Sequence, residues 1–377
     1  MTLRTILFLC DDPNDLGGLQ RVLATLAHQM RLEGTRVIVG SLLLRPQVGF
    51  LDPAIERVPL FREGTLSGLI QRVRIGPLHL QGRRLLRLRK IAQARARAKL
   101  RRLVSDVRPD AVIVFDSLMA KLATDAKLTG TRVLIQYHNS YGSLEPTADF
   151  GRLHKASQRA SAFLALTAED AVSFAKAGFA RTSFVSNPVP FYPETLPAVR
   201  EHRITALGRY HHQKAFDHLI AAWAAIPRKG DWHLDIYGEG PDRPLMEAAV
   251  QTGNVAASVT IHPPTWDAEA VLCRSSIYAL SSRYEGFGMV VVEAMACGIP
   301  VVSTRCGPGP EGLVDECGLL TDIGDTQGFG KQLQTLMDDE TQRNRLGTVG
   351  REKAGAYKVD AIVRRWEDVI TECSPVG

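Results

Sequence analysis

The sequence SSRYEGFGMVVVEAMACGIPVVS at residues 281–303 determines how the second half of this chain folds. Gly286 and Gly288 mark its start as a loop, the apolar run after them is typical of a short buried helix, and residues 299–303 are typical of a strand. This order is a repeating unit of parallel α/β sheets. The helix carries Glu293, a carboxylate that is costly to bury unless hydrogen-bond donors meet it. Backbone N–H groups or the paired hydroxyl groups of a ligand would supply such donors.

The chain of 377 residues has the composition of a globular protein, with 45% hydrophobic and 23% charged residues. This composition excludes disordered and fibrous classes, and the length favours two or three domains. No apolar run reaches the roughly 18 residues of a membrane helix. The apolar run at residues 6–10 is shorter than a signal-peptide core of about 7–15 residues. We therefore predict a cytoplasmic protein.

The six cysteines are scattered and form no Cys-x-x-Cys pair. This spacing favours neither a zinc site nor a disulfide framework. We expect them to be small buried side chains. Their positions are Cys10, Cys273, Cys297, Cys306, Cys317 and Cys373.

The N-terminal region starts with a strand, a glycine-containing loop, a helix and a second strand, predicted at residues 5–10, 11–18, 19–30 and 36–40. This unit begins a doubly wound parallel sheet. The loop ends in Gly17 and Gly18 at the start of the helix. Paired glycines at this place let backbone N–H groups approach a phosphate or a sugar, and a simple tight turn is the alternative.

Four prolines within ten residues, at positions 188, 190, 193 and 197, indicate a linker between two halves of the chain. Strands and helices alternate before this segment and again after it. We therefore predict an α/β protein with two doubly wound Rossmann-like domains. The predicted parts are a first domain at 1–187, a linker at 188–201, a second domain at 202–356, and a C-terminal segment at 357–377 whose amphipathic helix packs back on the first domain.

A histidine follows one of the predicted strands of the first domain. The strand at residues 133–137 ends at His138. Open parallel sheets bind their ligands at the carboxyl ends of the strands. His138 is therefore a candidate site residue, with a purely structural role as the alternative.

Positive charge is concentrated in one segment. Residues 64–105 contain twelve Lys or Arg and no acidic residue, in a chain of net charge +6. Within it, residues 83–104 have a helical apolar face made by Leu85, Leu88, Ala92, Ala96, Leu100 and Leu103. The basic region 72–102 is either a solvated face or a surface for anionic lipid head groups. No nucleic-acid-binding motif accompanies the charge, so we predict no nucleic-acid partner.

Several motifs resemble those of retaining glycosyltransferases of family 4, which have the GT-B fold. The segment EGFGMVVVEAMACGIPVV, with Glu285 and Glu293 eight positions apart, is similar to the family signature EGFG…EAxAxGxPVV. Arg209 and the segment 213–216, QKAF, resemble the family's GR…QKGF. The Gly17–Gly18 pair, His138 and the Asn187–Pro188 pair follow in family order across nearly the whole chain. Two positions depart from the family pattern, Ala215 in place of Gly and Gln20 in place of Glu.

This resemblance implies two Rossmann-like domains that face each other across a cleft, with the acceptor side in the first domain and the nucleotide-sugar donor in the second. It places Arg209 and Lys214 on the diphosphate, Glu285 on the transferred sugar and Glu293 on the ribose. The turn into the short helix would offer backbone N–H groups to the phosphates. The implied donor-binding set is Gly17, Gly18, Arg209, Lys214, Glu285, Gly286, Phe287, Gly288, Met289 and Glu293, and the implied catalytic residues are His138 and Glu285.

The family mechanism implies that the acceptor hydroxyl attacks from the face that the phosphate leaves, so that the anomeric configuration is retained. No Asp-x-Asp element occurs in the sequence, and we predict no metal. No cofactor is expected, since the nucleotide sugar is a substrate. The loop at 306–311 resembles one in relatives that build polysaccharides and lipid-linked glycans, often from UDP-hexoses. We predict a hexosyltransferase acting on such an acceptor at the inner membrane face. The alternatives are a nucleotide-sugar epimerase of the same architecture and a basic nucleic-acid-binding protein.

Overall fold

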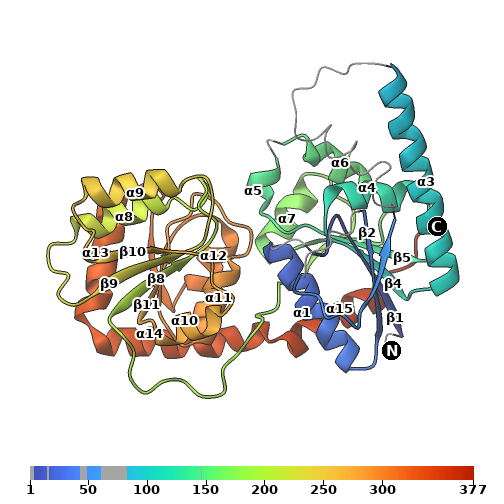
Figure 1. Ribbon diagram of the computed structural model, residues 1–377. Helices are drawn as coiled ribbons and strands as arrows, with labels where there is room; N and C mark the ends of the chain where they lie inside the picture. Colours follow the sequence, from blue (N-terminus) through green and yellow to red (C-terminus); the bar gives the residue numbers. More distant parts are fainter. Residues whose placement is uncertain (1–3, 15–16, 43–48, 61–82, 146) are drawn as a thin grey trace. The chain divides into compact units, whose positions relative to one another are not determined.

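The computed structural model describes residues 4–14, 17–42, 49–60, 83–145 and 147–377, without the side chains of 83–90. The chain forms two compact units (Figure 1). The first consists of Met1–Pro188 together with Val359–Gly377, and the second of Val189–Lys358. The predicted linker is thus counted with the second unit from Val189 on, and the C-terminal helix with the first.

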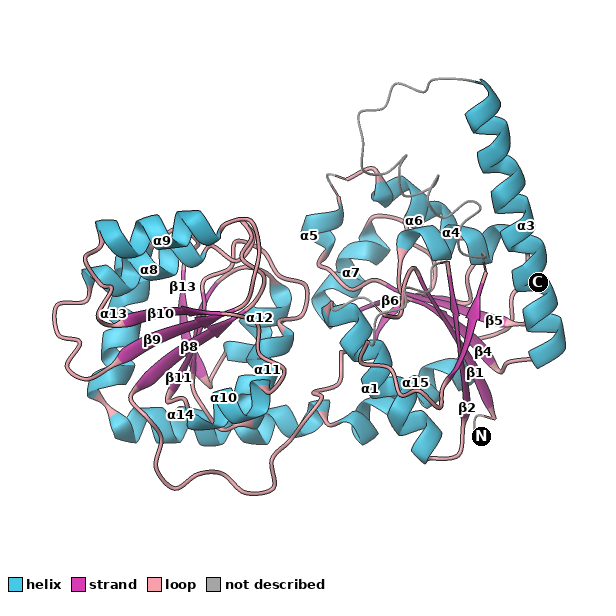
Figure 2. Ribbon diagram, in the orientation of Figure 1, coloured by secondary structure: helices cyan, strands magenta, loops and turns pink. Residues whose placement is uncertain are grey.

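The first unit is a parallel sheet with helices on both faces (Figure 2). Its strands are β1 (Thr5–Cys10), β2 (Arg36–Ser41), β3 (Glu56–Pro59), β4 (Ala111–Val114), β5 (Arg132–Gln136), β6 (Ala162–Ala165) and β7 (Thr182–Phe184). Its helices are α1 (Gly18–Leu32), α3 (Arg83–Val107), α4 (Ser117–Asp125), α5 (Tyr141–Leu144), α6 (Asp149–Ser157), α7 (Ala168–Lys176) and α15 (Val359–Glu372). The strand order in the described part is β3-β2-β1-β4-β5-β6-β7.

The second unit repeats this design with a parallel sheet of order β10-β9-β8-β11-β12-β13 in the described residues. Its strands are β8 (Arg203–Leu207), β9 (His233–Tyr237), β10 (Val259–His262), β11 (Ile277–Leu280), β12 (Val301–Thr304) and β13 (Gly318–Thr321). Its helices are α8 (Phe216–Ala225), α9 (Arg243–Thr252), α10 (Ala268–Arg274), α11 (Met289–Ala296), α12 (Pro308–Val314), α13 (Thr326–Asp338), α14 (Glu340–Ala354) and the 3-10 turn η1 (Gly355–Tyr357). The predicted fold class is confirmed.

Apolar runs account for these strands, because a strand of a parallel sheet is covered on both faces. Every residue of β4 and of β11 is buried. The apolar runs at 111–115 and 277–280 predict these strands, and the structure has them at Ala111–Val114 and Ile277–Leu280. A third apolar run, at 184–186, also predicts a strand, but this strand lies two residues earlier in the structure. The residues that pair with β6 are Thr182–Phe184, and only Val185 continues the ladder, through its N–H to the carbonyl of Ala165 at 3.0 Å.

The basic helix α3 is amphipathic where its side chains are described. Buried side chains recur every four residues from Ala92 to Val104, and this stripe packs in the core of the first unit. Arg95, Arg101 and Arg102 are exposed. The predicted apolar face is therefore correct from residue 92 on, with Val104 more deeply buried than Leu103; the side chains of 85 and 88, and residues 72–82, lie outside the described part.

The C-terminal helix α15 lies against α1 in the first unit. Its apolar side presents Ile362, Val363 and Trp366, all buried. Beyond the helix, the N–H of Val376 donates to the carbonyl of Thr131 at 3.1 Å. These contacts fix the last segment of the chain to the sheet of the first unit.

Both sheets reverse their strand order once, in the first unit between β1 and β4 and in the second between β8 and β11. At such a switch point the loops leaving two neighbouring strands diverge to opposite faces and leave a crevice at the carboxyl edge. The loop after β11, residues 281–288, belongs to the stretch that determines the fold. The topology thus brings this loop beside the loop after β8.

Candidate functional site

Three hydrogen bonds join the loops that follow β8 and β11. The N–H of Arg283 donates to the carbonyl of Gln213 at 2.8 Å, and the Gln213 side chain donates to the carbonyl of Tyr284 at 2.9 Å. The Ser281 hydroxyl donates to the carbonyl of Lys214 at 2.8 Å. The two loops therefore form one structure at the switch point of the second sheet.

Lys214 and Glu285 meet in this structure. The Lys214 ammonium lies 2.5 Å from Oε1 of Glu285, and the Ser282 hydroxyl donates to the same oxygen at 2.7 Å. Glu285 is 9% exposed and Ser282 is fully buried. The family resemblance implies that Lys214 binds a diphosphate; in the structure its charge is compensated by Glu285. The contact with Ser282 is not indicated by any motif.

Two glycines in the segment 307–309 allow its backbone to pack closely against the backbone of Glu285 and Gly286. The N–H of Glu285 donates to the carbonyl of Cys306 at 2.9 Å. A Cβ atom at Gly307 would lie 2.8 Å from the carbonyl oxygen of Glu285, and one at Gly309 would lie 2.3 Å from that of Gly286. The loop before α12 therefore holds the Glu285–Gly286 backbone in place.

The turn that leads into α11 contains a glycine with a left-handed backbone conformation. Gly288 has φ of +85° and precedes the first helical residue, Met289. Gly286, Phe287 and Gly288 are buried, and Met289 is half-buried. The N-terminus of α11 carries a partial positive charge and N–H groups suited to an anion.

Glu293 lies one turn further along α11 and is 1% exposed. Tyr278 lies on the neighbouring strand β11, and both glutamates affect its pKa. Burial raises the pKa of Tyr278, and the negative charges of Glu285 and Glu293 raise it further. The charges of both glutamates of the motif thus act on the same tyrosine.

Arg209 follows β8 and is exposed, with no ion pair to any residue that the structure describes. The backbone beside it is closely packed. Tyr210 is fully buried, and its hydroxyl donates to the carbonyls of Ile236 at 3.0 Å and His262 at 2.5 Å. A Cβ atom at Gly238 would lie 1.9 Å from the carbonyl oxygen of Gly208. Gly238 and Gly240, two glycines close together after a strand, are the sequence signal that could have indicated this close contact.

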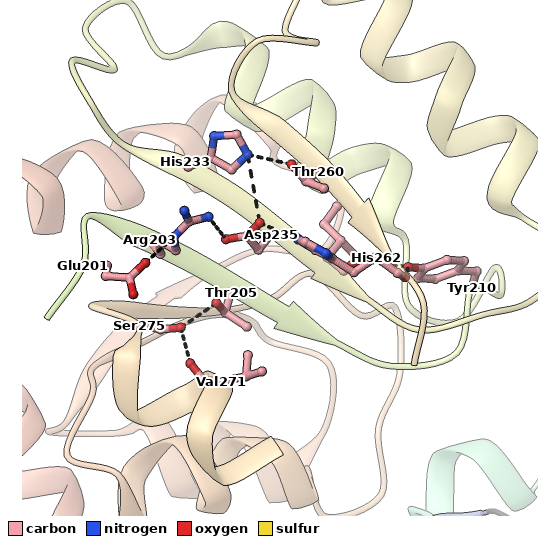
Figure 3. A network of polar contacts seen from close by, with 11 residues as sticks. Glu201, Arg203, Thr205, Tyr210, His233, Asp235, Thr260, His262, Val271 and Ser275 are labelled. Carbon is pink, nitrogen blue, oxygen red and sulfur yellow. Dashed lines mark hydrogen bonds and ion pairs between the residues drawn. The ribbon is translucent and has the colours of Figure 1, made fainter. Parts of the chain in front are cut away.

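A polar network covers the sheet face beside these loops (Figure 3). Asp235 on β9 is 1% exposed; its carboxylate accepts from Arg203 at 2.6 Å and contacts His262 at 2.7 Å. Thr205 on β8 bonds to Ser275, which follows α10, at 2.6 Å. Each buried polar group of this network has a partner, so the network ties β8, β9 and β10 together and we assign it a structural role.

The first unit contributes the other predicted site residues. His138 follows β5, and its ring meets the Phe115 ring edge-on at 4.7 Å between centroids. Burial lowers the pKa of His138 to about 3, so the imidazole is neutral at pH 7. Its Nε2 atom is buried and has no hydrogen-bond partner among the described residues.

The glycine pair lies at the start of α1. Gly17 is the N-cap residue, and the Gln20 side chain donates to the carbonyl of Asp12 at 3.1 Å. A Cβ atom at Gly18 would meet no atom of the described chain within 4 Å. The structure is compatible both with a tight turn and with the approach of a ligand at this point.

No group of three or more His, Cys, Asp or Glu side chains in the described part of the chain is arranged to hold a metal ion. Among the described residues, no helix has the length and apolar character needed to span a bilayer.

Residues 201–339 match the family model described as "Glycosyl transferases group 1". An uncharacterized glycosyltransferase of Haemophilus influenzae is 30% identical over 190 residues, which are 49% of this chain and 54% of the relative. The amylovoran biosynthesis glycosyltransferase AmsD of Erwinia amylovora is 26% identical over 193 residues, 49% of this chain and 55% of AmsD. This chain thus spans about half the length of these curated relatives.

Solved structures match over almost the whole chain. TarM of S. aureus has a TM-score of 0.79 and 12% identity, covering 98% of this chain and 99% of that one. HepE of Anabaena, solved in complex with UDP-glucose, has a TM-score of 0.75 and 19% identity, covering 97% and 99%. At these identities the matches show the fold, which is that of the GT-B structures.

Proposed function

We propose that this chain, a group 1 glycosyltransferase of family-4 type with the GT-B fold, transfers a hexose from a UDP-sugar to a hydroxyl group of a glycan or lipid-linked acceptor. The observation that carries the proposal is the Lys214–Glu285 contact at the switch point of the second sheet. This contact joins a cation and a carboxylate, and the N-terminus of α11 follows Glu285 by four residues in the chain. All three lie within the matched residues 201–339.

Each of these groups would bind a different part of the donor. Its diphosphate would bind to Lys214, to Arg209 and to the N–H groups that open α11. Glu293 would accept hydrogen bonds from the ribose hydroxyls, and Glu285 from those of the hexose. Hydrogen bonds to charged groups are worth about 1.5–3 kcal/mol each, so these two contacts would give much of the selectivity for a sugar nucleotide.

The reaction we propose retains the anomeric configuration. The acceptor oxygen forms its bond to the anomeric carbon on the face from which the phosphate oxygen departs, and that phosphate oxygen takes the acceptor's proton. Negative charge grows on the diphosphate as its bond to the sugar breaks. Lys214, Arg209 and the α11 N-terminus would stabilise this charge, which makes electrostatic stabilisation and positioning the main sources of catalysis.

We propose that His138 contacts a hydroxyl group of the transferred sugar. Because its imidazole is neutral at pH 7, it would form hydrogen bonds with hydroxyl groups and would not act as a fixed positive charge. We assign Gly17 and Gly18 to the same task through their backbone N–H groups.

The identity of the donor and acceptor rests on the relatives. HepE was solved with UDP-glucose, and AmsD acts in amylovoran biosynthesis, as their names state. We propose by analogy a UDP-hexose donor and a polysaccharide or lipid-linked acceptor. We also propose that no metal is needed, because Arg209 and Lys214 supply the positive charge; transfer that stops in the presence of EDTA and returns with Mg²⁺ would contradict this.

The basic helix α3 would bring the enzyme to its acceptor. Its exposed Arg95, Arg101 and Arg102 are suited to anionic lipid head groups at the cytoplasmic membrane face. This proposal places the chain at the membrane surface as a peripheral protein.

A thermal-shift panel of UDP, GDP, ADP and their hexose derivatives tests the donor assignment, since a ligand that binds only the folded state raises the melting temperature. We expect the largest shift with a UDP-hexose. A shift with none of the nucleotides would overturn the proposal. Incubation of the donor without an acceptor distinguishes the epimerase alternative, which would convert the hexose while it remains attached to UDP.

A further inference from the structure

We infer that Ser282 is a positioning residue that holds Glu285 with one carboxylate oxygen turned toward the donor sugar. This inference rests on the proposed function and adds to it a residue that is neither a predicted donor ligand nor a predicted catalytic group. It comes from the way two hydrogen-bond donors share one oxygen of Glu285.

Both donors that reach the Glu285 carboxylate bind Oε1. They are the Lys214 ammonium at 2.5 Å and the Ser282 hydroxyl at 2.7 Å. No donor from the described part of the chain binds Oε2 of Glu285. The carboxylate is therefore oriented, with Oε2 as the oxygen left to accept a hydrogen bond from a hydroxyl group.

The two donors differ in how firmly they are held. Ser282 is fully buried and has a single side-chain torsion, and its carbonyl accepts the Thr304 hydroxyl at 2.5 Å. Lys214 presents its charge on a flexible four-carbon stem and is half-buried. Ser282 is therefore the fixed support of Glu285, and Lys214 is the movable one.

This difference matters when the donor binds. A diphosphate carries more negative charge than one carboxylate and attracts the Lys214 ammonium away from Oε1. The Ser282 hydroxyl then remains as the donor that keeps Glu285 in its orientation. A role of this kind affects the contact with the sugar and leaves the contact with the nucleotide unchanged.

The experiment measures the affinities for UDP and for a UDP-hexose by titration calorimetry, with wild type and Ser282→Ala, and compares the two affinities within each protein. In Ser282→Ala we expect the UDP affinity to change by less than about twofold. The ratio of UDP-hexose affinity to UDP affinity should fall about tenfold, and kcat should fall by the same factor, because a hydrogen bond to a charged group is lost. Ser282→Thr, which keeps the hydroxyl, should recover most of both losses.

Ser303→Ala is the matched control, because Ser303 is also fully buried and, within the described part of the chain, its hydroxyl donates only to the carbonyl of Thr304, at 2.8 Å. It should leave the hexose-dependent affinity unchanged. Lys214→Met gives a second test that does not depend on the folding of the Ser282 variant. It should weaken UDP binding and preserve the ratio of UDP-hexose to UDP affinity, since Ser282 still supports Glu285.

An unchanged ratio in Ser282→Ala, or a ratio lost in Lys214→Met, overturns the positioning role while leaving the proposed function intact. The proposed function fails by a different result, a wild-type protein that binds neither UDP nor any UDP-hexose.

Discussion

At the residue scale, the two glutamates of the motif differ in their surroundings. Glu285 lies at the end of a loop with Lys214 and Ser282 on one oxygen. Glu293 lies inside an apolar helix and is 1% exposed. A buried carboxylate is retained in such a place only where donors meet it. Glu293 already has interactions within the chain, and we propose that the ribose hydroxyls also donate to it, so a substitution of Glu293 is the most direct test of the nucleotide contact.

The change Glu293→Gln keeps the size of the side chain and removes its charge. We expect UDP affinity to fall about 10- to 100-fold, which corresponds to the loss of charge-assisted hydrogen bonds of about 1.5–3 kcal/mol. Titration calorimetry with UDP checks this. Glu247→Gln on α9, an exposed residue paired with Arg243 at 2.8 Å, is the control. Wild-type UDP affinity in a folded Glu293→Gln protein would exclude the ribose assignment.

His138 gives a prediction about pH and stability. Its pKa is about 3 in the folded chain against 6.5 for the ordinary side chain, so between these values the unfolded chain binds a proton that the folded chain does not. Stability is therefore lost as the pH falls through this window, by at most about 1.4 kcal/mol per pH unit. His138→Gln should remove up to about 2 kcal/mol of the loss between pH 7 and pH 5, measured by urea unfolding. Equal pH dependence in both proteins would show that His138 is not desolvated.

At the element scale, the site depends on the loops after β8 and β9, whose backbones lie so close together that a Cβ atom would not fit between them. A Cβ atom at Gly238 would lie 1.9 Å from the carbonyl oxygen of Gly208, and the φ of Gly238 is +156°. The N–H of Tyr210 donates to the carbonyl of Glu239 at 2.7 Å and joins the same two loops. Its hydroxyl contacts the carbonyls of Ile236 on β9 and His262 at the end of β10. The position of Arg209, next to Tyr210, follows from this packing.

Replacing Gly238 by Ala should therefore destabilise the second unit by at least about 2 kcal/mol, because backbone atoms must move apart and the φ value is strained for any residue with a Cβ. Gly312→Ala is the control. A Cβ atom at Gly312 would meet no described atom within 4 Å, and this residue is in helix α12, where Ala is favoured by about 0.5–1 kcal/mol. Denaturant unfolding of both variants checks the difference. Equal stabilities would mean that the loops do not pack as described.

The same elements show what could be predicted from the sequence. The strand at 277–280 was predicted at its observed bounds because it is a continuous apolar run. Helix α12 was not predicted, since Pro308, Gly309 and Pro310 are typical of a loop; proline is nevertheless suited to the first turn of a helix, where its missing N–H is not required. Strand β3, with the sequence ERVP, has too few apolar residues for recognition, and it lies at the edge of the sheet, where Pro59 is tolerated.

The motif residues of the site could be recognised from their resemblance to the family signature. Their contacts with one another could not be predicted. The family resemblance implies separate roles for Lys214 and Glu285, as ligands of different parts of the donor. Their direct contact depends on which loops the sheet topology brings together. The hydrogen bond from Ser282 to Glu285 depends on a side-chain rotamer within that loop, which no pattern of residue types encodes.

At the scale of the whole molecule, charge is unevenly distributed along the chain. Residues 64–105 carry twelve basic and no acidic side chains. The described part of this segment belongs to helix α3, whose buried stripe packs in the first unit and whose Arg95, Arg101 and Arg102 face solvent. Such a helix would attract a surface of anionic lipids through long-range charge, which salt screens.

We expect the protein to bind vesicles that contain phosphatidylserine at low salt and to dissociate from them at high salt. The double change Arg95→Ala with Arg101→Ala should lower the partition coefficient roughly 30-fold, at about 1 kcal/mol for each arginine. Vesicle sedimentation at two salt concentrations measures this, with vesicles of phosphatidylcholine alone as the control. Equal binding to both lipids, or none at low salt, would remove the membrane role.

The central claim is that the second unit binds a UDP-hexose through Lys214 and Glu285, and titration calorimetry with UDP-glucose and other UDP-hexoses tests it most directly. The double variant Lys214→Met with Glu285→Gln removes both charges together, which avoids leaving one buried charge without its partner. We expect wild type to bind at least one UDP-hexose with a Kd of roughly 10–100 μM, near −6 kcal/mol, and the double variant to bind it at least 100-fold more weakly. A wild-type protein that binds no UDP-hexose, or a folded double variant that binds with unchanged affinity, would contradict the claim.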